Sequence, residues 1–272
     1  MPELGKRRLG RTGIMVTALG LGAMDTPTSP EGPETLRTAL DLGLNFVDTA
    51  REYDGSEFLI GQIIRERGGA AFHISSKTFS RTMNGSQRAV DRSLSVLGVA
   101  SIDIYMLHDV STGQAWDEVM ADSGPLEELR VAKYRGLIRQ IGISTHSLDL
   151  LEKATTCGEF DAVMVEYSAF YPQSAPLIDL AAERDIGVIA MRPVGGSGRT
   201  SVMRGRMAEG YSGPLTPAGL LRYVLSNQAV SVAIPGARYP SRIVENVETA
   251  AHPEPMTSSE RDQIEAEAVR LY

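Results

Sequence analysis

The sequence has a single cysteine and no long apolar run. One cysteine, Cys157, excludes an intramolecular disulfide, a metal site built from cysteines alone and an iron–sulfur cluster bound by this chain. No apolar run approaches the ~20 residues of a membrane span. The segment from Met1 to Arg8 is charged and has no apolar core of a secretion signal. We therefore expect a cytoplasmic protein with no membrane segment.

The sequence also has fewer basic than acidic residues. Lys and Arg number 27 against 34 Asp and Glu, which gives a net charge of −7. Nucleic acids and anionic membrane surfaces attract basic proteins, so neither is an expected partner. The chain is 42% hydrophobic and 22% charged, a balance that favours a folded protein with a large core. A small molecule is the expected partner, and the composition leaves the oligomeric state open.

Strand-like runs alternate with amphipathic stretches from one end of the sequence to the other. The runs are expected to end near Gly22, Asp48, Lys77, His108, Ser144, Val165, Met191 and Pro235. Eight such units without a linker predict an α/β protein of one domain, residues 1–272, folded as a (β/α)₈ TIM barrel. A doubly wound fold would need a third glycine after Gly20 and Gly22, followed at once by a helix, and the sequence offers neither.

Two further elements are expected outside the eight units. Residues Lys6 to Leu19 resemble a β-hairpin that turns at Arg11-Thr12-Gly13. An amphipathic stretch from Ser258 to Leu271 predicts an extra helix packed outside the barrel.

An acid, an ammonium and an imidazole stand at the ends of three consecutive strand-like runs. These residues are Asp48, Lys77 and His108, and Tyr53 follows shortly after the first of them. Barrel enzymes place their chemistry at the carboxyl ends of the strands, so the four side chains should converge. We expect Asp48 to pair with Lys77, and Lys77 to lower the pKa of Tyr53 so that the phenol can donate a proton. His108 could orient the oxygen of a carbonyl. A Lys–Asp pair or a histidine alone is more often structural. Four such residues at or near the ends of consecutive strands favour a proton-transfer site.

The same residues carry a family resemblance. The segment Asp48-Thr49-Ala50-Arg51-Glu52-Tyr53, then Ser76-Lys77-Thr78, then Met106-Leu107-His108-Asp109, resembles the aldo-keto reductase superfamily, without the iron–sulfur domain of one of its branches. The resemblance implies a barrel that binds a nicotinamide dinucleotide and reduces an aldehyde or ketone, with Tyr53 as the proton donor.

A second informative segment runs from Ile234 to Asn246. It has the pattern of a strand end, a turn and a helix opened by Pro240, with Arg242 in the first turn. Free N–H groups at a helix start together with an arginine are suited to a phosphate, although a solvated helix start gives the same pattern. By resemblance, Arg242 matches the arginine that selects NADP, while Glu245 and Asn246 match residues that hold the adenine.

The glycine-rich segment Met191 to Arg199 is expected to be a loop over the pyrophosphate. The resemblance implies that Ser144 and Thr145 hold the nicotinamide carboxamide. The full set of expected cofactor contacts is Ser144, Thr145, Met164, Met191, Arg192, Pro193, Val194, Gly195, Gly196, Pro235, Gly236, Arg238, Arg242, Glu245 and Asn246.

This chain departs from the family pattern at four of these positions. Thr145, Met164 and Met191 stand where asparagine, glutamine and an aromatic residue are usual, and Gly236 replaces a frequent lysine. NADP(H) stays the favoured cofactor through Arg242, NAD(H) is possible because Gly236 removes one phosphate-binding charge, and no metal is expected.

The resemblance implies that the substrate is a small carbonyl compound or alcohol, with a sugar or a natural-product carbonyl among the options. Met24, Trp116 and Tyr171 could line its pocket or could serve only in packing. Three alternatives stay open: a sugar or alcohol dehydrogenase working toward oxidation, a cofactor-binding sensor without catalysis, and a Schiff-base aldolase that uses Lys77.

Overall fold

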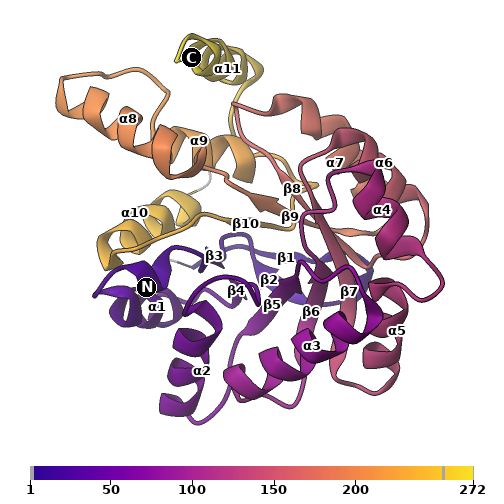
Figure 1. Cartoon of the computed structure of the whole chain (residues 1–272). Helices are drawn as coiled ribbons and strands as arrows, with labels where there is room; N and C mark the ends of the chain where they lie inside the picture. The colour runs from indigo at the N-terminus through magenta and orange to yellow at the C-terminus, as the bar shows by residue number, and fades with distance from the viewer. Residues whose placement is uncertain (1–2, 253–254, 272) are drawn as a thin grey trace.

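The computed structural model describes residues 3–252 and 255–271, and its centre is a parallel barrel surrounded by helices (Figure 1). Eight strands pair in the order β10-β9-β8-β7-β6-β5-β4-β3, so each strand lies beside its neighbour in sequence. The strands are β3 (Leu21–Gly22), β4 (Phe46–Asp48), β5 (His73–Thr78), β6 (Ile102–Leu107), β7 (Ile138–Thr145), β8 (Ala162–Glu166), β9 (Gly187–Met191) and β10 (Val232–Ile234). The predicted (β/α)₈ barrel is confirmed.

The barrel closes where its first and last strands meet. The amides of Gly20 and Gly22 donate to the carbonyls of Ala233 and Pro235, at 2.8 and 3.1 Å. A Cβ at Gly22 would lie 2.8 Å from the carbonyl oxygen of Ile234. The close backbone approach at the closure therefore requires these glycines.

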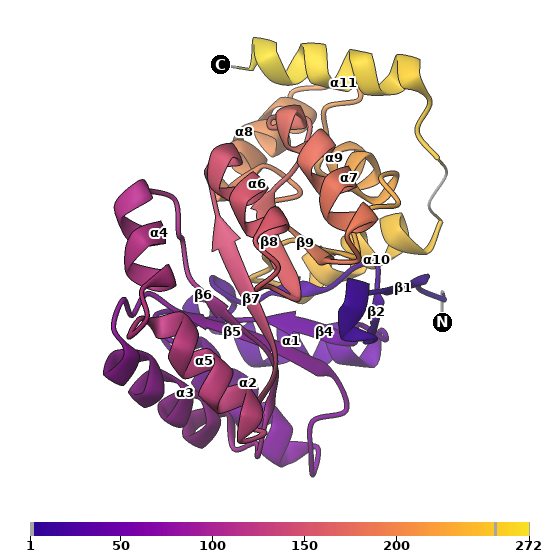
Figure 2. The same ribbon diagram turned by 90° about the vertical axis from the view of Figure 1, so that its right-hand side faces the viewer.

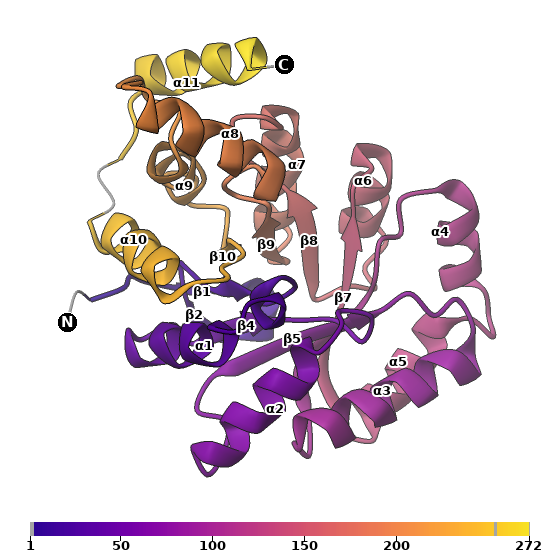
Figure 3. The same cartoon turned by 60° about the vertical axis from the view of Figure 1, so that its left-hand side comes forward.

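Helices cover the outside of the barrel (Figures 1 and 2). They are α1 (Gly32–Asp41), α2 (Ser56–Glu66), α3 (Met83–Leu97), α4 (Gly113–Met120), α5 (Pro125–Tyr134), α6 (Leu148–Thr156), α7 (Ala175–Glu183), α8 (Gly196–Ala208), α9 (Pro217–Leu225), α10 (Pro240–Ala251) and α11 (Ser258–Arg270). Figure 3 shows α1 and α10 side by side, where the first and last units meet. Two helices separate β6 from β7, and two separate β9 from β10.

The expected hairpin closes one end of the barrel. Strands β1 (Lys6–Arg8) and β2 (Met15–Thr17) pair antiparallel around a short 3₁₀ turn. Leu9 and Val16 are fully buried in a cluster with residues of the barrel interior, including Phe46 and Ile104. The hairpin therefore contributes apolar side chains to the core at the end opposite the strands' carboxyl ends.

The glycine-rich segment after β9 is only partly a loop, which corrects the sequence-based prediction. Residues 192–195 connect the strand to α8, and the helix begins at Gly196. Gly195 and Gly196 have φ values of 83° and 79°, a region that glycine adopts at little cost. The two glycines thus shape a sharp entry into a helix and do not form an extended flexible loop.

The extra helix predicted over Ser258 to Leu271 is present as α11. It lies outside the barrel, over the region of α8 and α9 (Figures 2 and 3). Among the described residues, no helix has the length and apolar character that crossing a membrane requires.

Candidate active site

Four polar side chains meet at the carboxyl ends of neighbouring strands. Asp48 is the last residue of β4, Lys77 lies near the end of β5, and His108 follows β6 directly. Tyr53 lies in the loop between β4 and α2. In a parallel barrel these ends share one rim, so the topology brings the four side chains together. We call these four residues the tetrad.

Lys77 and Asp48 form a buried ion pair. Lys77 Nζ lies 2.7 Å from Asp48 Oδ2 and donates a second bond of 2.8 Å to the carbonyl oxygen of Thr49. Ser75 Oγ donates to Asp48 Oδ1 at 2.8 Å. Lys77 is 1% exposed, and burial lowers the pKa of its ammonium while the charge of Asp48 opposes that shift. The hydrogen bonds hold both groups in one geometry.

Tyr53 lies against this pair. Lys77 Nζ is 4.7 Å from the centroid of the phenol ring. Contrary to expectation, the pKa of Tyr53 lies well above its ordinary value, because burial disfavours the phenolate and the carboxylates of Asp48 and Glu52 add to that effect. The sequence-based argument counted the charge of Lys77 and left out the burial of the phenol and the direct effect of the Asp48 and Glu52 carboxylates on it.

His108 is held between aromatic rings and a carboxylate. Its ring stacks on Phe79, with centroids 3.9 Å apart and an angle of 16° between the planes, and meets the ring of Tyr53 edge-on at 5.5 Å. His108 Nδ1 lies 3.6 Å from Glu52 Oε2. Glu52 and Phe79 were not among the predicted site residues. Their positions directly before Tyr53 and two residues after Lys77 were the available signal.

The expected nicotinamide contacts lie on neighbouring strands of the same rim. Ser144 and Thr145 end β7 and are buried, and Ser144 Oγ accepts a bond of 2.8 Å from the amide of Asp109. Met164 belongs to the apolar cluster inside the barrel, and Met191 packs against that cluster. Met164 is therefore part of the interior packing in the structure.

A buried carboxylate at the end of β8 is a further feature that the sequence reading missed. Glu166 Oε2 lies 3.2 Å from Arg192 and 3.4 Å from His146 Nδ1, and Oε1 lies 3.7 Å from Arg199. The Oε1 atom is buried without a hydrogen-bond partner within the described part of the chain. Arg192 has a φ of 50°, an unusual conformation for a residue with a side chain. The signal was a carboxylate at the end of an otherwise apolar strand.

The remaining loop residues follow the ends of β9 and β10. Pro193 and Val194 lie between β9 and α8, and Val194 packs against the core. Pro235 takes part in the barrel closure, and Gly236 forms a bridge with Gly22. A Cβ at Gly236 would have ordinary contact with the Gly22 oxygen, at 3.6 Å, so packing does not require glycine at that position.

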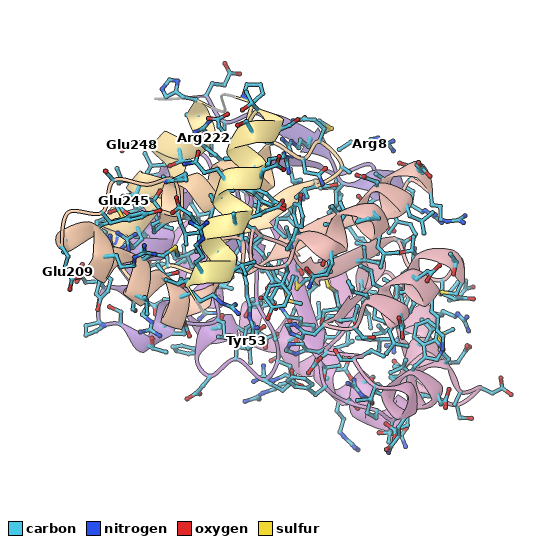
Figure 4. All side chains as sticks on the ribbon, turned by 90° about the horizontal axis from the view of Figure 1, so that it is seen from above. Arg8, Tyr53, Glu209, Arg222, Glu245 and Glu248 are labelled. Atoms are coloured by element: carbon cyan, nitrogen blue, oxygen red, sulfur yellow. The ribbon has the colours of Figure 1, made fainter. Side chains whose placement is uncertain are left out.

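Arginines gather around the start of α10. Arg242 lies 2.7 Å from Glu245 Oε1, and Arg204 of α8 lies 2.6 Å from Glu245 Oε2. Arg238 pairs with Asp25 at 3.2 Å. The first turn of α10 has no side-chain cap from Tyr239. These groups form a basic patch that links α8 to α10, and Figure 4 shows Glu245 toward the edge of the molecule, away from Tyr53. Asn246 lies half-buried on the same helix.

The three expected substrate residues occupy different surroundings. Met24 is half-exposed after β3. Trp116 of α4 packs edge-on against Phe160, with ring centroids 6.5 Å apart. Tyr171 lines a cavity of about 670 Å³ beside α11, where Arg199 lies 5.3 Å from its ring. Trp116 and Tyr171 thus have packing partners away from the tetrad, and a substrate role for them stays a prediction.

The titratable groups do not form a metal centre in the described segments, 3–252 and 255–271. No group of three or more His, Cys, Asp or Glu residues there could hold a metal ion.

The chain is similar to known proteins in sequence and in fold. The chain is 28% identical over 204 residues to the uncharacterized oxidoreductase YqkF of Bacillus subtilis, covering 70% of this chain and 64% of that protein. It is 25% identical over 308 residues to L-galactose dehydrogenase of Arabidopsis thaliana, covering 99% and 95%. The holo form of aldo-keto reductase AKR11C1 from Bacillus halodurans shares the fold, with a TM-score of 0.78 at 23% identity over 97% of this chain and 96% of that one.

The sequence profile of the aldo/keto reductase family matches residues 18–212, which include the whole tetrad and the β8 and β9 ends of the rim. This match spans most of the chain and agrees with the closed barrel. The chain therefore belongs to the aldo/keto reductase family, whose members are NAD(P)H-dependent oxidoreductases that act on carbonyl or alcohol groups.

Proposed function

We propose that this protein is an NADP-dependent reductase that converts an aldehyde or ketone to an alcohol. The observation that carries the proposal is the convergence of Asp48, Tyr53, Lys77 and His108 at one rim, with Lys77 Nζ 4.7 Å from the ring of Tyr53. Family membership supports the general reaction. The roles of the individual residues are part of the proposal.

Each residue has a separate task in the proposed reaction. The bound nicotinamide would supply a hydride to the carbonyl carbon. Tyr53 donates its hydroxyl proton to the carbonyl oxygen, and His108 donates a hydrogen bond that orients that oxygen. Lys77 holds a positive charge beside the phenol ring, which stabilises the phenolate that forms. Asp48 keeps Lys77 charged and fixed.

The rim carries unused groups that a dinucleotide would satisfy. Glu166 Oε1 is a buried acceptor without a hydrogen bond in the described chain, and a carboxamide N–H is a suitable partner. The start of α10 offers N–H groups that the side chain of its N-cap residue, Tyr239, does not cap. Ser144, whose Oγ accepts from Asp109, keeps a hydroxyl proton to donate. These features support a nicotinamide end at β7 and β8 and a phosphate end at α10.

The preference for NADP(H) rests on the basic patch. Arg242 and Arg204 both contact Glu245, so their guanidinium groups lie close together before a cofactor arrives. A 2′-phosphate would replace one carboxylate as their partner, and arginine binds phosphate through two parallel bonds. NAD(H) lacks this group and would gain less from the patch.

A second candidate is the reverse reaction, oxidation of a sugar or another alcohol. The relative from Arabidopsis thaliana that this chain matches over 95% of its length is an L-galactose dehydrogenase. The tetrad serves either direction, because the same proton leaves the alcohol when hydride moves to the oxidised cofactor. Assays with carbonyls and NADPH, and with aldoses and NADP⁺, would distinguish the two.

The aldolase alternative agrees less well with the geometry. Lys77 Nζ is buried and donates to two oxygens, so its lone pair has no free access to a carbonyl carbon. Borohydride reduction in the presence of an aldehyde should leave Lys77 unmodified. A sensor without catalysis would bind NADPH and turn over no substrate in the same assays.

Replacing the proton donor tests the proposal. Tyr53→Phe should lower kcat for aldehyde reduction by about 10²–10⁴-fold, because the general acid is removed while the ring is kept. The dissociation constant of NADPH, measured by fluorescence titration, should stay nearly unchanged.

Tyr134→Phe is the matched control, because Tyr134 is exposed on α5 and should leave kcat unchanged. Reduction by Tyr53→Phe at the parent rate would show that Tyr53 is not the proton donor.

A further inference from the structure

We propose that Glu52 is a positioning residue for His108: its carboxylate faces Nδ1 of the imidazole, holds a proton there and leaves Nε2 to serve the reacting oxygen and Tyr53. The inference rests on the proposed function, because it assigns a proton path within the same site. It adds one side chain, next to Tyr53 in the chain, to the four of the tetrad.

The carboxylate of Glu52 is fixed before any ligand binds. Its Oε1 accepts bonds of 2.8 Å from Thr78 Oγ1 and 2.9 Å from the amide of Phe79. Both donors use Oε1, so Oε2 remains for His108. The side chain is 31% exposed but has two anchors on the segment that follows Lys77. It therefore points at the imidazole because β5 and the next residues hold it there.

The imidazole is equally constrained. Phe79 stacks on one face of the ring, and Tyr53 meets it edge-on. His108 Nδ1 is buried and has no hydrogen-bond partner among the described residues. Its distance of 3.6 Å from Glu52 Oε2 is suited to an ion pair and slightly long for a hydrogen bond. Contacts of this kind often tighten when a substrate closes the site.

The charges around His108 oppose one another. Burial lowers the pKa of the imidazole, and the Lys77 ammonium lowers it further, whereas Glu52 and the more distant Asp48 raise it. In turn, His108 helps to hold the pKa of Glu52 below its ordinary value, against the effect of burial. Arg81 donates to the backbone carbonyl of His108 and not to its ring. Glu52 is therefore the carboxylate next to the ring that favours its charged form, while the net effect of the surroundings leaves the pKa of His108 below its ordinary value.

The consequence is a path by which His108 returns a proton to Tyr53 during reduction. A nicotinamide held at this rim would supply hydride to the carbonyl carbon; the C=O π pair would then move to oxygen, and that oxygen would take the proton of Tyr53. The phenolate then takes the Nε2 proton of the His108 imidazolium, and the neutral ring keeps its Nδ1 proton on Glu52. Solvent returns one proton to Nε2. This path gives the phenol, which burial makes a weak acid, a nearby source from which to recover its proton.

The experiment replaces Glu52 with an isosteric neutral residue. Glu52→Gln keeps a side-chain oxygen to accept from Thr78 and Phe79 and removes the charge. Long-range ¹H–¹⁵N spectra of the full-length protein report the tautomer and pKa of His108, identified among the four histidines by its loss in His108→Asn. We expect an Nδ1–H tautomer in the parent, and a pKa of His108 lowered by about one unit in Glu52→Gln.

The same variant should change the pH profile of kcat. Reduction that needs the imidazolium declines as pH rises through the pKa of His108, so in Glu52→Gln the decline should move to lower pH by about one unit. Asp54→Asn is the matched control, since it removes a charge from the same loop at an exposed position. Both the pKa of His108 and the profile should stay unchanged in that variant.

Several outcomes would overturn the inference. An Nε2–H tautomer in the parent, or an equal pKa of His108 in both proteins, would show that Glu52 does not control the ring. If the pKa of His108 shifts in Glu52→Gln but the pH profile of kcat does not, the proposed proton path is wrong. If Glu52→Gln fails to fold, Glu52→Asp, which keeps the charge, should give a smaller shift of the same sign. The spectra need no substrate, so a chain that shows the shift but reduces no carbonyl would contradict the proposed function alone.

Discussion

At the scale of single residues, the main feature is a charged pair held almost entirely out of water. Asp48 and Lys77 are stabilised by their contact and by bonds to Ser75 and the Thr49 carbonyl. Removing one member of a buried pair leaves the other with its desolvation cost and no compensating charge. Reactivity and stability are therefore linked at this position.

Asp48→Asn should lower the free energy of unfolding by about 3–5 kcal/mol, because the Lys77 ammonium stays buried without its counter-charge. Urea denaturation followed by circular dichroism measures the change. Adding Lys77→Met to the same variant should recover part of the loss, since the unpaired charge is then gone.

The control for this prediction is Asp41→Asn. Asp41 pairs with Arg67 at 2.6 Å, but its side chain is mostly exposed, so water screens the pair and little stability should be lost. Equal losses for Asp48→Asn and Asp41→Asn would mean that the tetrad pair is no better protected from water than a surface pair.

At the scale of elements, α11 is attached by few but well-placed contacts. Ile264 and Ala268 are its buried residues, and Tyr223 of α9 donates a bond of 2.6 Å to Glu265. Arg222 of the same helix lies 3.4 Å from Glu260, and Figure 4 shows Arg222 beside the first turns of α11. The helix begins with a capping box between Thr257 and Glu260. Its docking depends on one large apolar side chain and a row of polar contacts.

Ile264→Ala should lower the free energy of unfolding by about 2–3 kcal/mol, because it removes three carbons from a fully buried site. The loss should appear as a lower midpoint of thermal or urea unfolding. The amide hydrogens of α11 should also exchange faster with solvent. Val269→Ala on the same helix is the control, because Val269 is 76% exposed. Similar losses for both variants would show that α11 is not anchored through Ile264.

At the scale of the whole molecule, an acidic protein carries a local basic patch. The net charge is −7, yet Arg204, Arg238 and Arg242 gather around the start of α10. The overall charge repels anions, so binding of an anionic cofactor would depend on the local arrangement of these side chains. Because α8 and α10 come from different parts of the chain, the patch exists only in the folded barrel.

Arg242→Ala should raise the dissociation constant of NADPH by about tenfold or more and barely change that of NADH, because only NADPH carries the 2′-phosphate. Fluorescence titration with each cofactor measures the two constants. Arg130→Ala on α5 is the control, since Arg130 lies in a surface cluster with Glu127 and Glu159. An equal loss for both cofactors would place Arg242 at a phosphate that they share.

Much of the fold and the outline of the site could be read from the sequence. Alternating apolar runs and amphipathic stretches predict strand and helix order, and parallel strands of a closed barrel bring Asp48, Lys77 and His108 to one rim. The start of α8 at Gly196 was missed, because glycines that permit a sharp helix entry look the same in sequence as glycines of a flexible loop.

The sequence by itself determined part of the site, and the tertiary structure decided two further properties: which side chains lie together, and how they shift a pKa. The sequence determined which residue types reach the rim, because strand period and strand end depend on local pattern. It did not determine which way Glu52 and Phe79 point, or that Arg204 of α8 would lie beside Arg242 of α10. It also led to the wrong direction for the pKa of Tyr53, since that direction depends on burial and on the sum of surrounding charges. Those are sums over neighbours in space, and only the folded chain supplies the neighbours.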